Sequence, residues 1–300
     1  MAEKTELSPE ALKKFRPAKK FFIAFDSDGC VFDTMEIKHK ECFIPNIIHH
    51  WELQAISKYA REAAEFVNLY SKWRGANRFP ALLKVFDLLE ERPEVKRRGV
   101  AIPKVPSLRE WTAREKALGN PALKAEVART NDPILAKTLK WSEAVNKRIE
   151  EMVYGVPPFP FVREILGKAK ESCDMIVVSQ TPTEALVREW HEHRIDSFVS
   201  LICGQEMGSK TDHLIVTTKG HYEKDHALMV GDAEGDLKAA RAAGTLFFPI
   251  NPGHEEESWE RFWKEGFDRF LKGTFAGDYE AKLIEEFRKY LPEQPPWQKR

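Results

Sequence analysis

The feature that most constrains the fold is the stretch Phe21–Thr34, which reads FFIAFDSDGCVFDT. Its first five residues are apolar and predict a short buried strand. The apolar run ends at Asp26, a second carboxylate follows at Asp28, and Gly29 lets the backbone turn tightly. Two carboxylates at the end of a buried strand are costly unless their charge is compensated, and a divalent cation such as Mg²⁺ is the usual compensation.

Open α/β sheets bind their ligands at the carboxyl ends of the strands. We therefore predict a metal-dependent active site at Asp26 and Asp28. The same Asp-x-Asp-Gly string also fits an ordinary surface turn, so the remainder of the chain has to decide between the two interpretations.

The length and composition of the chain limit the kinds of binding partner that we expect. The chain has 300 residues, which favours two domains at about 150 residues each. Lysines and arginines number 47 and so do aspartates and glutamates, so we expect neither nucleic acid nor a membrane surface as a partner. No apolar run approaches the roughly 20 residues that span a bilayer. The cysteines are Cys30, Cys42, Cys173 and Cys203, and their spacing is not that of metal ligands, so we expect no zinc site. Because the sequence shows no secretory signal, these cysteines favour a reducing cytoplasm as the location of the protein.

The predicted secondary structure changes near residue 35 and again after residue 155. Residues 35–155 have helical apolar patterns, as in Ser57–Trp73, and no convincing strand. Beyond them helices alternate with short apolar runs, which predict strands over residues 174–179, 198–204, 226–231 and 245–250. Alternation of this kind indicates an α/β fold with a doubly wound parallel sheet.

Two domains follow from this pattern. Residues 1–34 and 156–300 are predicted to form the α/β core, and residues 35–155 a helical domain inserted after the first strand. The end of the chain, Pro292–Arg300, is polar and rich in proline, so we expect it to be disordered.

Polar residues follow the other strands too. Ser179 ends the second, Asp232 ends the fourth, and Asp236 comes four residues later. Lys210 lies near the start of the helix before the fourth strand. Singly, each fits a plain role as a helix cap, a turn residue or a solvated lysine, but jointly their order and placement are specific.

This combination resembles the haloacid dehalogenase superfamily of phosphatases with an aspartate nucleophile. Its four motifs match Asp26-Ser-Asp28-Gly29 with Asp33-Thr34, then Ser179, then Lys210, then Gly231-Asp232 through Asp236. The helical insertion lies where that superfamily has a type-one cap, here longer than many. Lys210 lacks the proline that often follows the motif lysine; Lys219 and Lys224 are alternatives that lie closer to the fourth strand.

The resemblance implies a role for each residue. Asp26 would be the nucleophile that takes the phosphoryl group, and Asp28 the general acid and then the base. Mg²⁺ would bind Asp26, the main-chain carbonyl of Asp28, and Asp232. Ser179 and Lys210 would hold phosphoryl oxygens. Asp236 would order Lys210 or a metal-bound water.

Substrate selection is expected from the cap. The stretch between Lys72 and Pro80 lies between two predicted helices and contains the cations Lys72, Arg74 and Arg78. We expect a small polar phosphorylated metabolite whose leaving group touches Arg74 or Arg78. An ordinary solvated turn between helices is the alternative.

Two other functions compete with a phosphatase. A sugar phosphomutase of the same superfamily would share all four motifs. A non-catalytic phosphoacceptor, such as a receiver domain, would also combine aspartates, a hydroxyl and a lysine, but its phosphoacceptor lies on a later strand and its chain is much shorter. The sequence names neither the substrate nor the oligomeric state.

Overall fold

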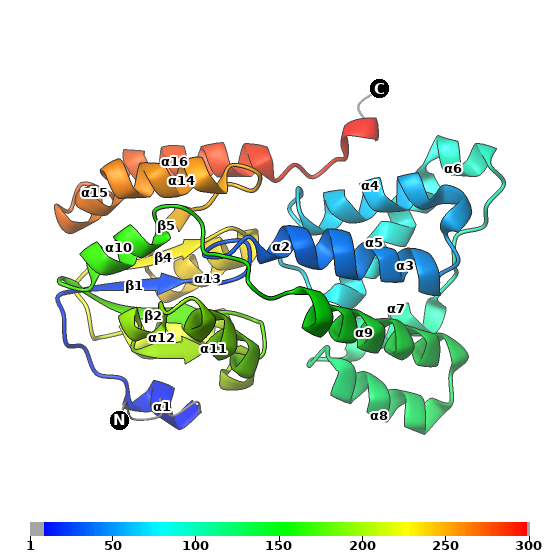
Figure 1. Cartoon of the computed structure of the whole chain (residues 1–300), viewed down its shortest axis with the longest axis horizontal. Coiled ribbons are helices and arrows are strands. Elements are labelled where there is room, and N and C mark those ends of the chain that lie inside the picture. Colours follow the sequence, from blue (N-terminus) through cyan, green and yellow to red (C-terminus); the bar gives the residue numbers. More distant parts are fainter. Residues whose placement is uncertain (1–8, 299–300) are drawn as a thin grey trace. The chain divides into compact units, whose positions relative to one another are not determined.

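The computed structural model describes residues 9–298, which divide into two compact units. Unit 1 contains residues 9–34 and 155–291, and unit 2 contains residues 35–154 and 292–298. The chain therefore leaves unit 1 after its first strand, builds unit 2, and returns (Figure 1).

Unit 1 is built on a five-stranded parallel sheet with the order β3-β2-β1-β4-β5. The predicted α/β fold with a parallel sheet is confirmed. Its strands are β1 (Phe21–Phe25), β2 (Cys173–Val178), β3 (Leu201–Cys203), β4 (Ala227–Gly231) and β5 (Leu246–Pro249). The strand predicted over residues 198–204 is shorter because β3 is an edge strand, with only three residues paired to β2 and a 3₁₀ turn before it.

Both faces of the sheet are covered, which explains why the strands read as continuous apolar runs. Phe21, Ile23 and Phe25 of β1 face one cluster of buried side chains, and Phe22 and Ala24 face another. The first cluster includes side chains of α10 (Val162–Ala169), α11 (Thr183–Glu192), α14 (Glu255–Arg261) and α15 (Phe267–Leu271). The second includes side chains of α1 (Pro9–Lys14), α12 (Lys210–Thr218) and α13 (Glu234–Ala243), while α16 (Asp278–Tyr290) contributes to both.

Unit 2 is helical throughout its regular structure, within the residues described. Its α-helices are α3 (Ile44–His50), α4 (Ser57–Asn68), α5 (Arg78–Glu91), α6 (Pro93–Arg97), α7 (Pro106–Arg114), α8 (Asn120–Thr130) and α9 (Pro133–Met152), preceded by α2 (Thr34–Ile37) and the π-helix Lys38–Phe43. Helix α9 begins as its Asp-Pro sequence predicts, because the Asp132 carboxylate accepts hydrogen bonds from the first-turn N–H groups. The core of this unit is aromatic, with Trp111 and Trp141 packed edge to face against Phe79.

The expectation of disorder at the C-terminus is wrong for residues 292–298. The Trp297 ring packs against Phe66, with centroids 5.7 Å apart, and the Arg92 guanidinium lies 4.4 Å from the Trp297 centroid. Glu293 forms an ion pair with Lys72. One aromatic anchor orders this polar segment against unit 2, and its partners lie far away in sequence. Residues 299 and 300 lie outside the described part of the chain.

None of the helices in residues 9–298 combines the length and the apolar character that crossing a bilayer requires.

A buried histidine in α12 makes the stability of unit 1 dependent on pH. His213 is fully buried, and burial lowers the pKa of its imidazole from 6.5 to about 4. The folded protein therefore holds the neutral ring, whereas the unfolded chain binds a proton more readily. This contribution is complete above pH 6.5 and is lost as the pH falls towards 4.

We expect the free energy of unfolding to decline more steeply between pH 6.5 and 4 in the wild type than in His213→Leu. The difference in decline should reach about 3 kcal/mol, because a shift of one pKa unit corresponds to about 1.4 kcal/mol. Urea denaturation of both proteins at a series of pH values measures it. Parallel declines would show that His213 does not titrate in this way.

Candidate active site

Three buried carboxylates meet at the carboxyl ends of the central strand β1 and its neighbour β4. Asp26 directly follows β1, and Asp232 directly follows β4, which pairs with β1. The Asp26 N–H donates to the Val230 carbonyl at 3.0 Å, so the pairing of the strands continues to the first carboxylate. Asp26 is 5% exposed and Asp232 2%, and each offers an oxygen within 4.8 Å of the other and of Asp236.

Lys210 reaches this cluster from the first residue of α12. Its Nζ lies 2.8 Å from Asp26 Oδ2 and 2.6 Å from Asp236 Oδ1. A capping box fixes where the helix begins, since Ser209 and Asp212 bond each other's backbone N–H groups. The start of α12 therefore delivers the lysine to the carboxylates.

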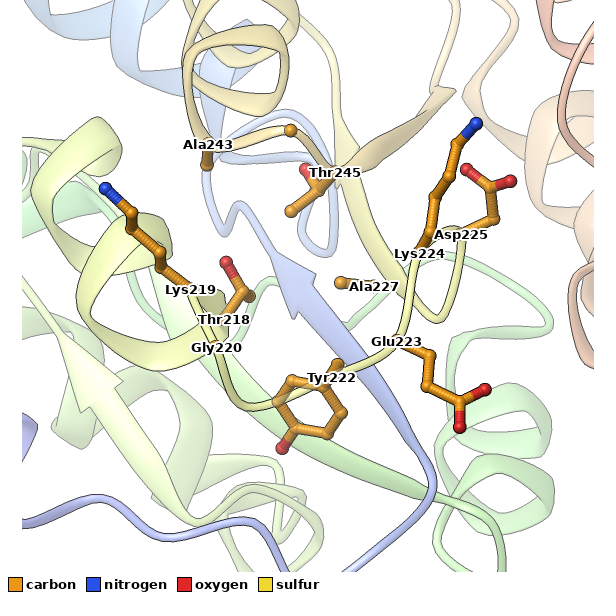
Figure 2. Close-up of a pocket in the computed structure, with 11 residues that line it drawn as sticks. Thr218, Lys219, Gly220, Tyr222, Glu223, Lys224, Asp225, Ala227, Ala243 and Thr245 are labelled. Atoms are coloured by element: carbon orange, nitrogen blue, oxygen red, sulfur yellow. The ribbon is translucent and has the colours of Figure 1, made fainter.

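The alternative lysines lie elsewhere. Lys219 and Lys224 border a hollow of about 180 Å³ (Figure 2). It is formed by the loops that precede β4 and β5, so it lies at the amino ends of these strands, whereas Asp26 and Asp232 follow the carboxyl ends of theirs. Two hydroxyls that line this hollow, those of Thr218 and Thr245, already donate to helix carbonyls. Of the three candidate lysines, Lys210 is the one that the structure brings to Asp26.

Asp236 organises the loop after β4. One carboxylate oxygen accepts the N–H groups of Asp232, at 3.2 Å, and Ala233, at 3.0 Å, while the other accepts from Lys210. This packing needs a glycine at position 231, because a Cβ there would lie 2.5 Å from the Asp236 Cβ. Asp236 therefore holds both the Asp232 backbone and the Lys210 ammonium.

Asp28 lies in the same loop as Asp26 but has different partners. Its Oδ1 accepts a hydrogen bond from the Thr34 hydroxyl at 2.5 Å, and its Oδ2 accepts one from Thr181 at 2.7 Å. Gly29 follows with φ of 75°, the left-handed conformation that the tight turn requires. Among the described residues, the three-carboxylate cluster does not include the Asp28 side chain.

Ser179 lies just past the end of β2, beside β1. It is buried, its N–H donates to the Cys203 carbonyl at 2.9 Å, and its hydroxyl accepts the Thr181 N–H at 3.2 Å. Thr181 is a site residue that the sequence analysis did not single out. The signal available was its hydroxyl, two residues beyond Ser179 in the loop that follows the strand.

Burial dominates the electrostatics of the cluster. It raises the pKa of the Asp26 carboxyl, an effect that the Lys210 ammonium opposes and that Asp236 and Asp232 reinforce. Burial alone would lower the pKa of Lys210, but Asp236 and Asp26 together outweigh it and raise that pKa. Three carboxylates thus face one ammonium.

This arrangement fits a divalent cation. With all four groups ionised, the formal charge is −3 + 1 = −2. The donor atoms are carboxylate oxygens, which hard cations prefer. Asp26, Asp232 and Asp236 each offer a carboxylate oxygen to such a cation, and Asp236 also holds Lys210 and the N–H groups that follow β4.

The predicted cap cations have partners within unit 2. Lys72 is exposed and forms an ion pair with Glu293. Arg74 is buried, and its guanidinium donates to the Leu69 carbonyl at 3.0 Å.

Arg78 is the first residue of α5 and is also engaged. Its guanidinium donates to Ser142 and to Asn146, and it lies 5.0 Å from the Phe43 ring centroid. Burial lowers the pKa of Arg78 to about 10. These hydrogen bonds and ion pairs link the three cations to other residues of unit 2. The role of the cations in selecting a substrate stays a prediction.

A comparison with known protein families matches part of the chain. Residues 115–250 match the family model of haloacid dehalogenase-like hydrolases. That span contains Ser179, Lys210, Asp232 and Asp236, and Asp26 lies beside the last three of these in space. The match covers less than half of the chain and extends from unit 2 into the α/β unit as far as β5.

Solved structures of such hydrolases are among the similar folds. A protein assigned as a phosphoglycolate phosphatase from Lactobacillus delbrueckii subsp. bulgaricus has 16% identity and a TM-score of 0.46, over 90% of this chain and 98% of its own. A haloacid dehalogenase-like family hydrolase from Streptococcus pneumoniae has 15% identity and a TM-score of 0.44, over 89% and 98%. No curated protein sequence matches this chain.

The cluster of three buried carboxylates predicts that a divalent cation stabilises this protein. Added MgCl₂ or MnCl₂ should raise the melting temperature of the wild type, because a ligand that binds only the folded state stabilises it. Asp232→Asn should remove most of the increase, since it deletes a charged oxygen from the cluster. Differential scanning fluorimetry measures the shift.

Asp225→Asn is the matched control, because Asp225 borders the hollow at the amino ends of β4 and β5. It should retain the wild-type increase. Equal increases in all three proteins would place cation binding outside this cluster.

Proposed function

We propose that this protein is a Mg²⁺-dependent phosphatase that hydrolyses a small phosphorylated metabolite through an aspartyl phosphate on Asp26. One observation supports this most: the two carboxylates of the Asp-x-Asp string have different environments. Asp26 is buried against Lys210, and Asp28 is less buried and accepts two threonine hydroxyls. Carboxylates with different surroundings can take different roles in one reaction.

Asp26 is the candidate nucleophile. Its Oδ1 accepts the Ser27 N–H at 2.8 Å and its Oδ2 contacts Lys210, so the carboxylate is held in one orientation. A carboxylate oxygen would attack phosphorus while the bond from phosphorus to the leaving oxygen breaks. The product of this step is an acyl phosphate on Asp26.

Asp28 is the candidate acid and base. It would give a proton to the leaving oxygen as the first bond breaks. It would then take a proton from the water that attacks the phosphorus of the aspartyl phosphate. Release of phosphate restores the Asp26 carboxylate. The hydroxyls of Thr34 and Thr181 fix the position of Asp28 for both transfers.

The remaining residues would bind the phosphoryl group. Ser179 and Lys210 supply a hydroxyl and an ammonium for its oxygens. Mg²⁺, when bound, would neutralise charge on the phosphoryl oxygens. Asp26, Asp232 and the main-chain carbonyl of Asp28 would hold it. The helical domain predicted over residues 35–155, which lies in unit 2 up to residue 154, would act as the cap that selects the ester.

A sugar phosphomutase is the second candidate, because it would use the same core residues. The two differ in the acceptor of the second transfer, which is water in a phosphatase and a sugar phosphate in a mutase. Stimulation of turnover by a sugar bisphosphate would favour the mutase. A non-catalytic phosphoacceptor would take one phosphoryl group from acetyl phosphate and show no turnover.

Asp26→Asn tests the proposal. With an aryl phosphate and MgCl₂, the variant should lose at least about 10³-fold in kcat, because an amide is a poor nucleophile. Release of the phenol measured by absorbance gives the rate. Screening the wild type on phosphorylated metabolites would then identify the best ester.

Asp278→Asn is the control, since this exposed aspartate begins α16. It should keep wild-type turnover. An Asp26→Asn protein that retained most of the activity would rule out Asp26 as the nucleophile.

A further inference from the structure

The loop from Asp26 to Phe32 carries both carboxylates of the proposed reaction. Its backbone is folded around the Ser27 carbonyl, which accepts three N–H groups; the donors are Cys30 at 3.3 Å, Val31 at 2.9 Å and Phe32 at 3.0 Å. Because Asp26 and Asp28 are two residues apart in this loop, its conformation sets the distance and orientation between them.

Two tryptophans from different helices donate hydrogen bonds to this loop. Trp190 of α11 donates its indole N–H to the Ser27 hydroxyl at 3.0 Å. Trp259 of α14 donates its indole N–H to the Cys30 carbonyl at 2.8 Å. Both side chains are fully buried. The loop is therefore tied at two points, one on each side of Asp28.

Each of the two tryptophans also makes an aromatic contact beside its hydrogen bond. The Trp190 ring meets the Phe32 ring edge to face, with centroids 5.9 Å apart. The Trp259 ring stacks on Phe25, the last residue of β1, with centroids 6.2 Å apart. The same two side chains thus contact the loop and the strand that leads into it.

The two hydrogen bonds distinguish these tryptophans from the other buried ones in residues 9–298. Trp51, Trp111 and Trp141 are also buried, in unit 2, and their indole nitrogens have no hydrogen-bond partner. Packing alone is enough to bury a tryptophan in this protein. The buried indoles that donate are the two beside the Asp26–Phe32 loop.

We propose that Trp190 and Trp259 are positioning residues for the phosphoryl transfer, and this rests on the proposed function. Their indole N–H groups hold the loop so that Asp26 and Asp28 have a productive separation. Ser179 and Lys210, which would bind the phosphoryl group, belong to other segments. Loss of an indole N–H should therefore affect the chemical step more than the binding of substrate.

Trp190→Phe and Trp259→Phe test this, because phenylalanine keeps an aromatic ring and removes the donor. Each should lower kcat for an aryl phosphate by about 10-fold or more, with KM changed less than about 3-fold. Amide hydrogen exchange of residues 26–32 should become faster in both variants. Trp141→Phe, the matched control, removes an indole N–H that makes no hydrogen bond, so it should change neither quantity.

A double variant tests the route through Ser27. If Trp190 acts through the Ser27 hydroxyl, then Ser27→Ala combined with Trp190→Phe should lower kcat no more than the worse single change. Additive losses would contradict that route. Unchanged kcat and exchange in both tryptophan variants, with Asp26→Asn inactive, would overturn this inference and leave the phosphatase proposal intact. Equal activity in the wild type and Asp26→Asn would instead overturn the phosphatase proposal.

Discussion

The structure depends on the accumulation of negative charge at the carboxyl end of a buried parallel sheet. Asp26 and Asp232 are there because β1 and β4 pair side by side and end within one residue of each other. In water such carboxylates would be solvated, whereas burial raises the pKa of Asp26 and makes its charge costly. Lys210 compensates part of that charge, and a divalent cation is suited to compensate the rest.

The surrounding elements are arranged to maintain this cluster. The capping box at Ser209 fixes where α12 starts, and so it fixes the backbone position of Lys210, the first residue of that helix. Asp236 accepts from the lysine and from the backbone N–H groups that follow β4, which couples the position of the ammonium to that of Asp232. Asp28, in the same loop as Asp26, accepts hydrogen bonds from two threonine hydroxyls. The result is one buried carboxylate beside an ammonium and a second that is separately held.

The positions of several site residues were predictable from sequence, because in a parallel sheet the residues that follow the strands lie together at the carboxyl ends of those strands. That rule located Asp26, Ser179 and Asp232 without knowledge of any contact. What local patterns could not predict are partners distant in the chain: Trp259 donates to Cys30 across 229 residues, and Trp297 packs against Phe66. The predicted loop of cap cations shows the same limit, since nothing near Arg78 in sequence reveals that Ser142 and Asn146 accept from it.

If Asp26 carries the phosphoryl group during turnover, as we propose, that group can be found on the protein. The wild-type protein would be mixed with an aryl phosphate and MgCl₂, quenched in acid within one turnover, digested and analysed by mass spectrometry. We expect a phosphoryl group on the carboxylate of Asp26 and none on Asp28. Phosphorylation at another residue, or full turnover with no phosphoprotein at any quench time, would contradict it.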